Sequence, residues 1–465
     1  MAGLVNRVGG AAFFTVLAQI VTALSMPVVT RLYSPSEYGS LNLVLAFIAV
    51  TAGVYGLRYE MAIPVATGAA EADALYRLAI RIAFLWTVLV AISVFLIPES
   101  TMGAAGFDTP VAIALVPLCA IAAYWLGLAS NQAVRAKSYV RLGVSKVVAA
   151  SSQGGVQLLA GLTSLGAAGL LLGFASSRVL ATLVVRRRPS SRTPWSALVQ
   201  AGKKWDQFPR YSMPASVVGA LGIQASPILV ALLYGAHETG LYALAVTVLA
   251  LPAAVVGQVA GQVFLGEIAR EGSESRRASL MTISRLLVIA SWGFYMWVFV
   301  FAEEIFDLVF GSDFAEAGGL ARAMAVAYAI SCAVSPLSTL PIVLGRQRQA
   351  FFISVAETVA RLVVLVGFGM LVDLDAMVLA FGAVGALIPT VYFMWLLRLV
   401  GTNLTAWTRS FSLQGLSLLA LLAVLLGARV GVPHDLLAAG LGLAATALLT
   451  VVLLVREVRR VPAVA

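Results

Sequence analysis

Five ionisable residues lie inside long apolar stretches of this 465-residue chain: Arg58, Glu60, Arg178, Glu357 and Arg361. An ionisable group at membrane depth is costly unless it has a partner or faces a water-filled cavity, so each of them is a candidate for function. Three arginines stand against two carboxylates. Because guanidinium groups bind phosphate oxygens in a bidentate manner, this small excess predicts a cavity for an anionic cargo, such as a phosphate or pyrophosphate head group.

Arg58 and Glu60 are two residues apart in the segment Gly56–Glu60. If the apolar stretch 41–65 is one helix, their side chains point about 200° apart and do not easily pair. At least one of them must then face a cavity or another helix. Two interpretations of Arg58 follow: it lines a cavity and meets an anionic group, or it makes a structural pair with another helix near the cytoplasmic end.

Glu357 precedes Arg361 by four residues, which is the favourable order for an ion pair on one helix face. Mutual neutralisation is one interpretation of this pair. In the other, Arg361 faces the cavity, and Glu357 tunes it or takes part in ion coupling. Arg178 stands eight residues before the basic block that begins at Arg186. It either lines the cavity or extends its head group to the membrane surface.

The elements that must position these residues are membrane-spanning helices. Hydrophobic residues make up 61% of the chain and charged residues 11%, against roughly 45–50% and about 25% in soluble domains. Apolar runs long enough to cross a bilayer recur along the whole chain. We predict an all-α transmembrane bundle with about fourteen spans, near residues 10–31, 41–65, 79–97, 110–130, 143–161, 166–185, 211–233, 241–265, 283–302, 319–344, 350–372, 376–398, 411–430 and 435–455.

The charges between these runs predict the orientation of the chain. With the N-terminus in the cytoplasm, basic residues collect in the inner loops and acidic residues in the outer loops, as the positive-inside rule requires. Both termini are then cytoplasmic. The net charge of +10 comes in short blocks rather than on one soluble face, which argues against a nucleic-acid partner. The main inner basic residues are Arg135, Lys137, Arg141, Lys146, Arg186, Lys203, Lys204, Arg210, Arg276, Arg277, Arg346 and Arg348.

An internal repeat divides the predicted spans. Segments 32–39 and 233–240 match at an offset of 201 residues, with Leu, Tyr, Glu and Gly in common. Ser34, Pro35 and Glu37 also predict a capped helix start in the first copy. An even number of spans separates the copies, so the repeat is parallel. We predict an N-lobe at 1–185, a basic cytoplasmic linker at 186–210, a C-lobe at 211–400 and two accessory spans at 401–465. Two such lobes suit alternating access.

Several kinds of chemistry have no residues to support them. The sequence has no phosphate-binding loop of the Walker type. The two histidines, His237 and His434, and the two cysteines, Cys119 and Cys332, have no metal-ligand spacing. The predicted outer loops are too short to carry the catalytic groups of a membrane glycosyltransferase or polymerase. We therefore expect no enzyme activity, no catalytic residue, no cofactor and no metal site.

Four segments carry a resemblance to a known family: 27–39, 57–63, 206–214 and 240–245. Their order and spacing resemble those of bacterial polysaccharide biosynthesis proteins of the Wzx type, from about residue 5 to about residue 400. The resemblance implies a lipid-linked oligosaccharide flippase of the multidrug/oligosaccharidyl-lipid/polysaccharide (MOP) exporter superfamily. Such proteins have two six-helix lobes, often two further helices, and a cationic central cavity.

The resemblance also implies a cargo and a location. The cargo would be an undecaprenyl-pyrophosphate-linked sugar unit, turned from the cytoplasmic to the periplasmic leaflet of the bacterial inner membrane. Arg58 would bind the pyrophosphate, and Arg361 lies in a plausible matching helix. An H⁺ or Na⁺ gradient would drive the cycle, with Glu60 or Glu357 as the coupling group. A polysaccharide polymerase and other assembly proteins are the partners that such a role suggests.

Two other functions stay open. One is an ion-coupled drug or cation exporter of the same superfamily, although that cargo would favour a surplus of buried carboxylates. The other is a membrane component of a polysaccharide assembly complex that does not itself transport.

Overall fold

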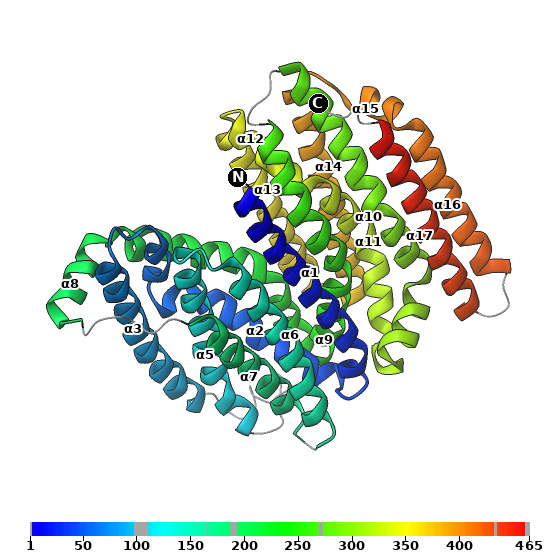
Figure 1. The fold of residues 1–465 in the computed structure, drawn as a ribbon. Coiled ribbons are helices and arrows are strands. Elements are labelled where there is room, and N and C mark those ends of the chain that lie inside the picture. Colours follow the sequence, from blue (N-terminus) through cyan, green and yellow to red (C-terminus); the bar gives the residue numbers. More distant parts are fainter. Residues whose placement is uncertain are drawn as a thin grey trace. The chain divides into compact units, whose positions relative to one another are not determined.

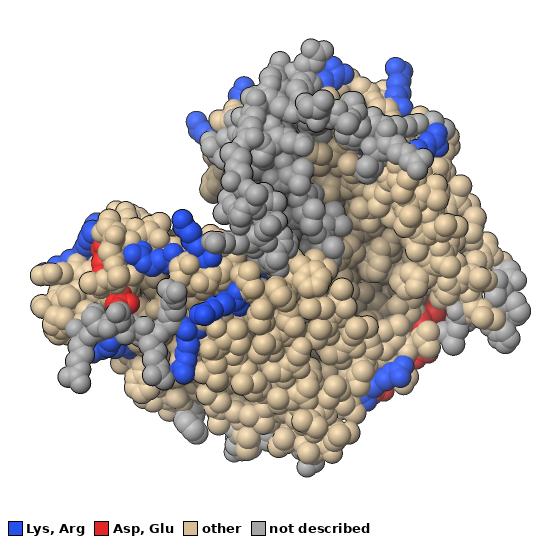
Figure 2. Space-filling view, viewed as in Figure 1, with Lys and Arg blue, Asp and Glu red and all other residues tan. Residues whose placement is uncertain are grey.

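The computed structural model describes residues 2–96, 110–163, 165–186, 193–268, 273–431 and 435–460. These residues form helices and short connections, without a β-strand among them, so the all-α prediction is confirmed (Figure 1). The chain divides into two compact units, Met1–Gly240 and Leu241–Ala465. In the view of Figure 2, most of the described surface carries neither basic nor acidic side chains, as expected for a chain that faces lipid.

The first unit holds the elements that position Arg58, Glu60 and Arg178. Its core packs α2, α3, α5 and α7 together, while α1 lies along α6 (Figure 1). The elements are α1 (Ala2–Thr30), α2 (Pro35–Tyr55), the 3₁₀ helix η1 (Tyr59–Val65), α3 (Ala69–Phe95), α5 (Pro110–Arg135), α6 (Tyr139–Gly161), α7 (Ala167–Val185), α8 (Trp195–Lys204) and the π-helical turn η2 (Phe208–Ser212).

The second unit holds Glu357 and Arg361. Helix α9 (Met213–Ile268) runs from the first unit into it. The further elements are α10 (Ser273–Phe310), η3 (Ser312–Phe314), α11 (Glu316–Val334), η4 (Ser335–Thr339), α12 (Leu340–Val343), α13 (Gln347–Val363), the π-helical turn η5 (Val364–Phe368), α14 (Leu374–Leu399), α15 (Leu404–Ser410), α16 (Ser412–Gly431) and α17 (Asp435–Arg460).

The number of membrane spans is lower than predicted when each helix is judged by length and composition. Eleven helices of the described chain qualify, or twelve if the bent pair α15 and α16 is one span. The count of fourteen stays a prediction. The difference arises at α6, which is absent from the eleven, and at α9, whose apolar segment Phe208–Ala253 is counted once. That segment of 46 residues would be about 70 Å long, more than twice the ~30 Å of a bilayer core, and its backbone is non-helical at Gly235.

The two copies of the sequence repeat meet within the first unit. The predicted helix start at Ser34 is confirmed: Ser34 and Glu37 form a capping box at the start of α2. A Cβ atom at Gly39 would overlap the carbonyl oxygen of Ala236, and one at Gly240 would overlap that of Pro35. Positions 35 and 236, like 39 and 240, are 201 residues apart, so this reciprocal contact is what a local twofold relation between the copies produces.

Two ion pairs fasten the C-terminal helices to α10 in the second unit. Glu457 of α17, only 2% exposed, pairs with Arg285 of α10 at 3.2 Å and accepts a hydrogen bond from Gln414 Nε2 at 2.9 Å. Toward the other end of α10, Arg429 of α16 pairs with Glu304 at 2.9 Å. A pair of this kind is costly to break because the remaining charge is left without a partner. Helices α16 and α17 are therefore held to α10.

Candidate functional site

The segment between α2 and α3 carries two of the predicted site residues in an unusual backbone conformation. Helix α2 ends at Tyr55, and Leu57 and Arg58 follow with φ of 48° and 62°, in the left-handed region. For residues other than glycine this conformation costs on the order of 1 kcal/mol or more each, and it persists where the surroundings enforce it. The expectation of one helix over 41–65 is wrong here, because the backbone leaves the right-handed helical conformation at Leu57 and Arg58.

This turn brings Arg58 and Glu60 together. Arg58 Nη1 lies 3.7 Å from Glu60 Oε1. The expectation that the two side chains would point apart is therefore also wrong: it assumed helical spacing, and the helix has ended before Arg58. The Arg58 side chain is 31% exposed and that of Glu60 only 7%, so the carboxylate lies behind the guanidinium.

Tyr124 of α5 holds the other oxygen of this carboxylate. Its hydroxyl donates to Glu60 Oε2 at 3.1 Å, and its ring lies 5.9 Å from that of Tyr55. A Cβ at Gly56 would overlap the Tyr124 hydroxyl, so this position needs glycine. Glu60 lies between the candidate membrane spans Pro35–Tyr55 and Ala69–Val94. Burial raises the pKa of Glu60, and the Tyr124 hydrogen bond and the Arg58 charge oppose that rise only in part.

Arg58 and Glu60 line a cavity of about 170 Å³ between α2 and α5. Its other polar wall residues include Tyr124 and Asn131, while Gly127 leaves space on the α5 side. Since one water takes about 30 Å³ of liquid volume, the cavity has room for a group of phosphate size. A guanidinium that is about one-third exposed on such a wall can bind a phosphate oxygen.

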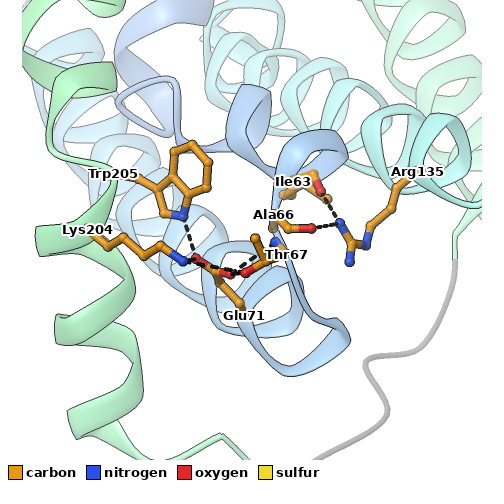
Figure 3. A network of polar contacts seen from close by, with 7 residues as sticks. All are labelled: Ile63, Ala66, Thr67, Glu71, Arg135, Lys204 and Trp205. Atoms are coloured by element: carbon orange, nitrogen blue, oxygen red, sulfur yellow. Dashed lines mark hydrogen bonds and ion pairs between the residues drawn. The ribbon is translucent and has the colours of Figure 1, made fainter.

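Contacts at the far end of the segment fix its position. Arg135, at the end of α5, donates from Nη1 to the carbonyl oxygens of Ile63 at 3.0 Å and Ala66 at 2.5 Å, as Figure 3 shows. These carbonyls lie at the end of η1, where the helix itself supplies no donor. Tyr59 donates from its hydroxyl to the carbonyl oxygen of Gly202 in α8 at 3.2 Å. The segment that carries Arg58 is thus tied to α5 and to α8.

The second pair, Glu357 and Arg361, lies on α13 in the other unit. Arg361 Nη2 is 2.6 Å from Glu357 Oε1, and the two side chains are 34% and 31% exposed. The guanidinium also lies 5.4 Å from the ring of Phe381 in α14. The structure shows the mutual pairing that the spacing of four residues predicts. Among the described residues neither side chain has a further ion pair, and ion coupling and cargo binding by this pair stay predictions.

Arg178 of α7 lies apart from Arg58 and Glu60 in its contacts. Its guanidinium is 4.5 Å from the ring of Phe174, one turn earlier on the same helix. In the part of the chain that the structure describes, no ion pair includes Arg178. The aromatic ring provides part of the stabilisation that a counter-ion would give. Whether Arg178 meets a cargo stays a prediction.

Comparison with known families shows what kind of chain this is. Residues 28–318 match the family described as "Polysaccharide biosynthesis protein". The chain belongs to this family. The match covers more than half of the chain and confirms the resemblance that the sequence motifs indicate. A comparison with curated proteins found no match.

Solved structures show the same fold for this polysaccharide biosynthesis protein. The lipid II flippase MurJ in an inward-closed conformation is similar with a TM-score of 0.70 and 13% identity, over 98% of this chain and 100% of MurJ. An inward-facing multidrug resistance MATE transporter of the MOP superfamily has a TM-score of 0.60 and 14% identity, over 84% and 96%. A MOP transporter from Pyrococcus furiosus, described by a reversed polarity of its binding pocket, has a TM-score of 0.56 and 14% identity, over 85% and 95%.

The fold of this family member is therefore that of MurJ and the MATE transporters, and the protein is a multi-pass membrane protein. Sequence reasoning missed one residue of the site, Tyr124, because a tyrosine in an apolar run looks like any other buried aromatic. Only the fold brings it to Glu60. The one signal was Gly56, a small residue directly before the charged segment, which leaves space for the Tyr124 hydroxyl.

Proposed function

We propose that this polysaccharide biosynthesis protein is a flippase for oligosaccharides linked to undecaprenyl pyrophosphate. It moves them from the cytoplasmic to the periplasmic leaflet of a bacterial inner membrane, for an O-antigen, capsule or exopolysaccharide. The observation that carries the proposal is Arg58, held in a left-handed turn on the wall of a cavity of phosphate size. Family membership supports a role in polysaccharide synthesis, and the MurJ-like fold supports a transport mechanism.

The geometry of Arg58 suits a pyrophosphate head group. A guanidinium has five N–H donors, and Nη1 is the one that lies 3.7 Å from Glu60. The remaining donors are available on the exposed side of the group. The strained backbone places the guanidinium before cargo arrives, which lowers the entropy that binding would otherwise lose. The polyprenyl tail would stay in lipid while the lobes predicted at 1–185 and 211–400 alternate between inward and outward access.

Glu60 gives this site a route to proton coupling. Arg58 stabilises the charged form of Glu60, and an anion that binds Arg58 weakens that stabilisation. Binding of the head group then favours protonation of Glu60, and by linkage a proton on Glu60 favours binding of the head group. Binding should therefore weaken as the pH rises through the pKa of Glu60. Glu357 is the second candidate for ion coupling, and a dependence on Na⁺ at constant pH would favour sodium.

The direct test is transport by the purified full chain in proteoliposomes, with a fluorescent undecaprenyl-pyrophosphate oligosaccharide and a quencher that reaches only one leaflet. We expect transport by the wild type and a loss of at least about tenfold for Arg58→Gln, since a hydrogen bond to a charged group contributes roughly 1.5–3 kcal/mol. Arg346→Gln removes an exposed arginine in the second unit and serves as the matched control, with transport unchanged.

Two results would redirect the proposal. Equal transport by wild type and Arg58→Gln would show that the head group binds elsewhere. Export of organic cations, without movement of any lipid-linked sugar by the same well-folded preparation, would indicate an exporter of the MATE kind.

A further inference from the structure

A second cavity lies between α3 and α8, away from the Arg58 cavity. Helix α3 has 27 residues and is therefore about 40 Å long, which exceeds the ~30 Å of a bilayer core. Its first turns must extend into the head-group layer. Helix α8 runs back along these turns: Arg81 lies 5.3 Å from the ring of Trp195, and Lys204 pairs with Glu71 at 2.6 Å. By the distribution of basic residues, this is the predicted cytoplasmic side.

Helix α8 has the composition of a helix at a membrane surface. Leu198 and Ala201 are buried against the first unit, whereas Trp195 is 65% exposed. Lys203 and Lys204 at its end are also exposed. Basic residues with an exposed tryptophan on a short amphipathic helix are typical of elements that lie among lipid head groups.

The one carboxylate at this cavity is already compensated. Glu71 accepts hydrogen bonds from Thr67 N at 3.1 Å, Thr67 Oγ1 at 2.5 Å and Trp205 Nε1 at 2.8 Å, in addition to the ion pair with Lys204 (Figure 3). Figure 3 shows Lys204 and Trp205 reaching from the end of α8 to this group. Glu71 is paired with Lys204, while Lys203 on α8 and Arg81 on α3 add two further cations to these two helices.

The cavity itself has a volume of about 420 Å³. Its walls combine small apolar side chains, such as Ala70 and Ala197, with the polar side chains of Thr193 and Gln200. The Thr193 hydroxyl is buried and has no hydrogen-bond partner among the described residues. A cavity with apolar walls, an available hydroxyl and cations at its rim fits a polar group that carries a single negative charge.

We propose that this cavity binds the head group of an anionic phospholipid from the surrounding leaflet. The phosphodiester would lie toward Lys204 and Lys203, and its polar substituent toward Gln200 and Thr193. The amphipathic helix α8 with its exposed Trp195 places this cavity among lipid head groups, so the lipid is a better ligand than a free phosphate. The binding does not depend on the proposed cargo. An effect of the bound lipid on transport would rest on the proposed function. It would reach the Arg58 segment through the hydrogen bond from Tyr59 to Gly202 of α8.

The test uses the purified full chain in neutral detergent, titrated with short-chain phosphatidylglycerol or phosphatidylcholine, with bound lipids counted by native mass spectrometry. We expect one phosphatidylglycerol per chain to bind in preference to phosphatidylcholine. The double variant Arg81→Gln, Lys203→Gln leaves the Glu71 network intact. It should weaken this binding about twenty-fivefold, since each surface cation contributes about fivefold to the attraction of an anionic lipid.

Two further variants separate a site from general charge. Arg346→Gln with Arg348→Gln removes the same charge from the second unit and should leave the binding unchanged. Ala70→Leu keeps every charge but fills the cavity from an exposed position, and should abolish the preference for phosphatidylglycerol. Equal weakening by both double variants, no effect of Ala70→Leu, or tighter binding of glycerol phosphate than of the lipid would each overturn the proposal.

Discussion

The two arginine–glutamate pairs of this protein are built in opposite ways. Glu357 and Arg361 are four residues apart on the regular helix α13, meet at 2.6 Å and are each about one-third exposed. Arg58 and Glu60 are two residues apart and lie 3.7 Å from each other only because the helix has ended. The Glu60 side chain is 7% exposed. A helix provides the first pair without strain. The second requires two left-handed residues, and a conformation kept at such a cost indicates a functional constraint.

The largest difference between the pairs should appear when one arginine is removed. Arg58→Met leaves Glu60 buried without its cation, which we expect to lower stability by about 3 kcal/mol or more. Arg361→Met should cost about 0.5 kcal/mol, because its pair is partly exposed and lies on one helix. Thermal unfolding of the purified variants in detergent measures both.

A double variant controls for the first of these effects. Arg58→Met with Glu60→Gln should recover most of the lost stability, because no buried charge remains. It should not recover transport. If Arg58→Met and Arg361→Met unfold at the same temperature, Glu60 is solvated well enough to need no cation, and the contrast between the pairs is lost.

A smaller difference should follow from the glycines beside the two pairs. Gly56→Ala places a Cβ where the Tyr124 hydroxyl lies, so Tyr124 must move from Glu60, at a cost of about 2 kcal/mol. Gly385→Ala in α14 would meet only the Cβ of Ala327 at 3.1 Å and would stand 3.9 Å from Arg361 Nη2, which we expect to cost under 1 kcal/mol. The unfolding temperatures of the two glycine variants measure this difference. A more stable Gly56→Ala protein would show that Tyr124 has other positions available.

The sequence could predict the helices because their signal is local. Long apolar runs and the capping residues Ser34 and Glu37 are each sufficient without tertiary contacts, and the repeat at an offset of 201 residues was visible as matching letters. The contact between the two copies of the repeat could not be predicted from the sequence. That Gly39 and Gly240 each face a carbonyl of the other copy depends on two helices crossing, which no local pattern specifies.

The site was predictable only in part, for the same reason. Charge within an apolar run correctly pointed to Arg58 and Glu60 as a group that needs partners. The predicted geometry of the pair was wrong because Leu57 and Arg58 have positive φ angles. Neither leucine nor arginine favours that conformation, so the sequence gives no sign of it. Helix α8, inside the predicted linker 186–210, also escaped notice, because an amphipathic helix of ten residues has no long apolar run. Residues 187–192 of that linker lie outside the described chain.

A further difference concerns the hydrogen bond from Tyr124, for which the α13 pair has no counterpart among the described residues. Tyr124→Phe removes a donor to Glu60 Oε2, worth roughly 1.5 kcal/mol for a bond to a charged group, with little change in shape. The donor stabilises the carboxylate, so its loss raises the pKa of Glu60 further. Glu60 then stays protonated to a higher pH.

If protonated Glu60 favours head-group binding, the affinity of Tyr124→Phe for a labelled polyprenyl pyrophosphate should persist to higher pH than that of the wild type. Glu60→Gln should bind with no pH dependence in that range, and Glu357→Gln should follow the wild-type curve. A wild-type affinity that does not change with pH would exclude Glu60 as the coupling group. A curve altered by Glu357→Gln and not by Tyr124→Phe would transfer the coupling to the helical pair, and would mean that the strained turn serves only to place Arg58.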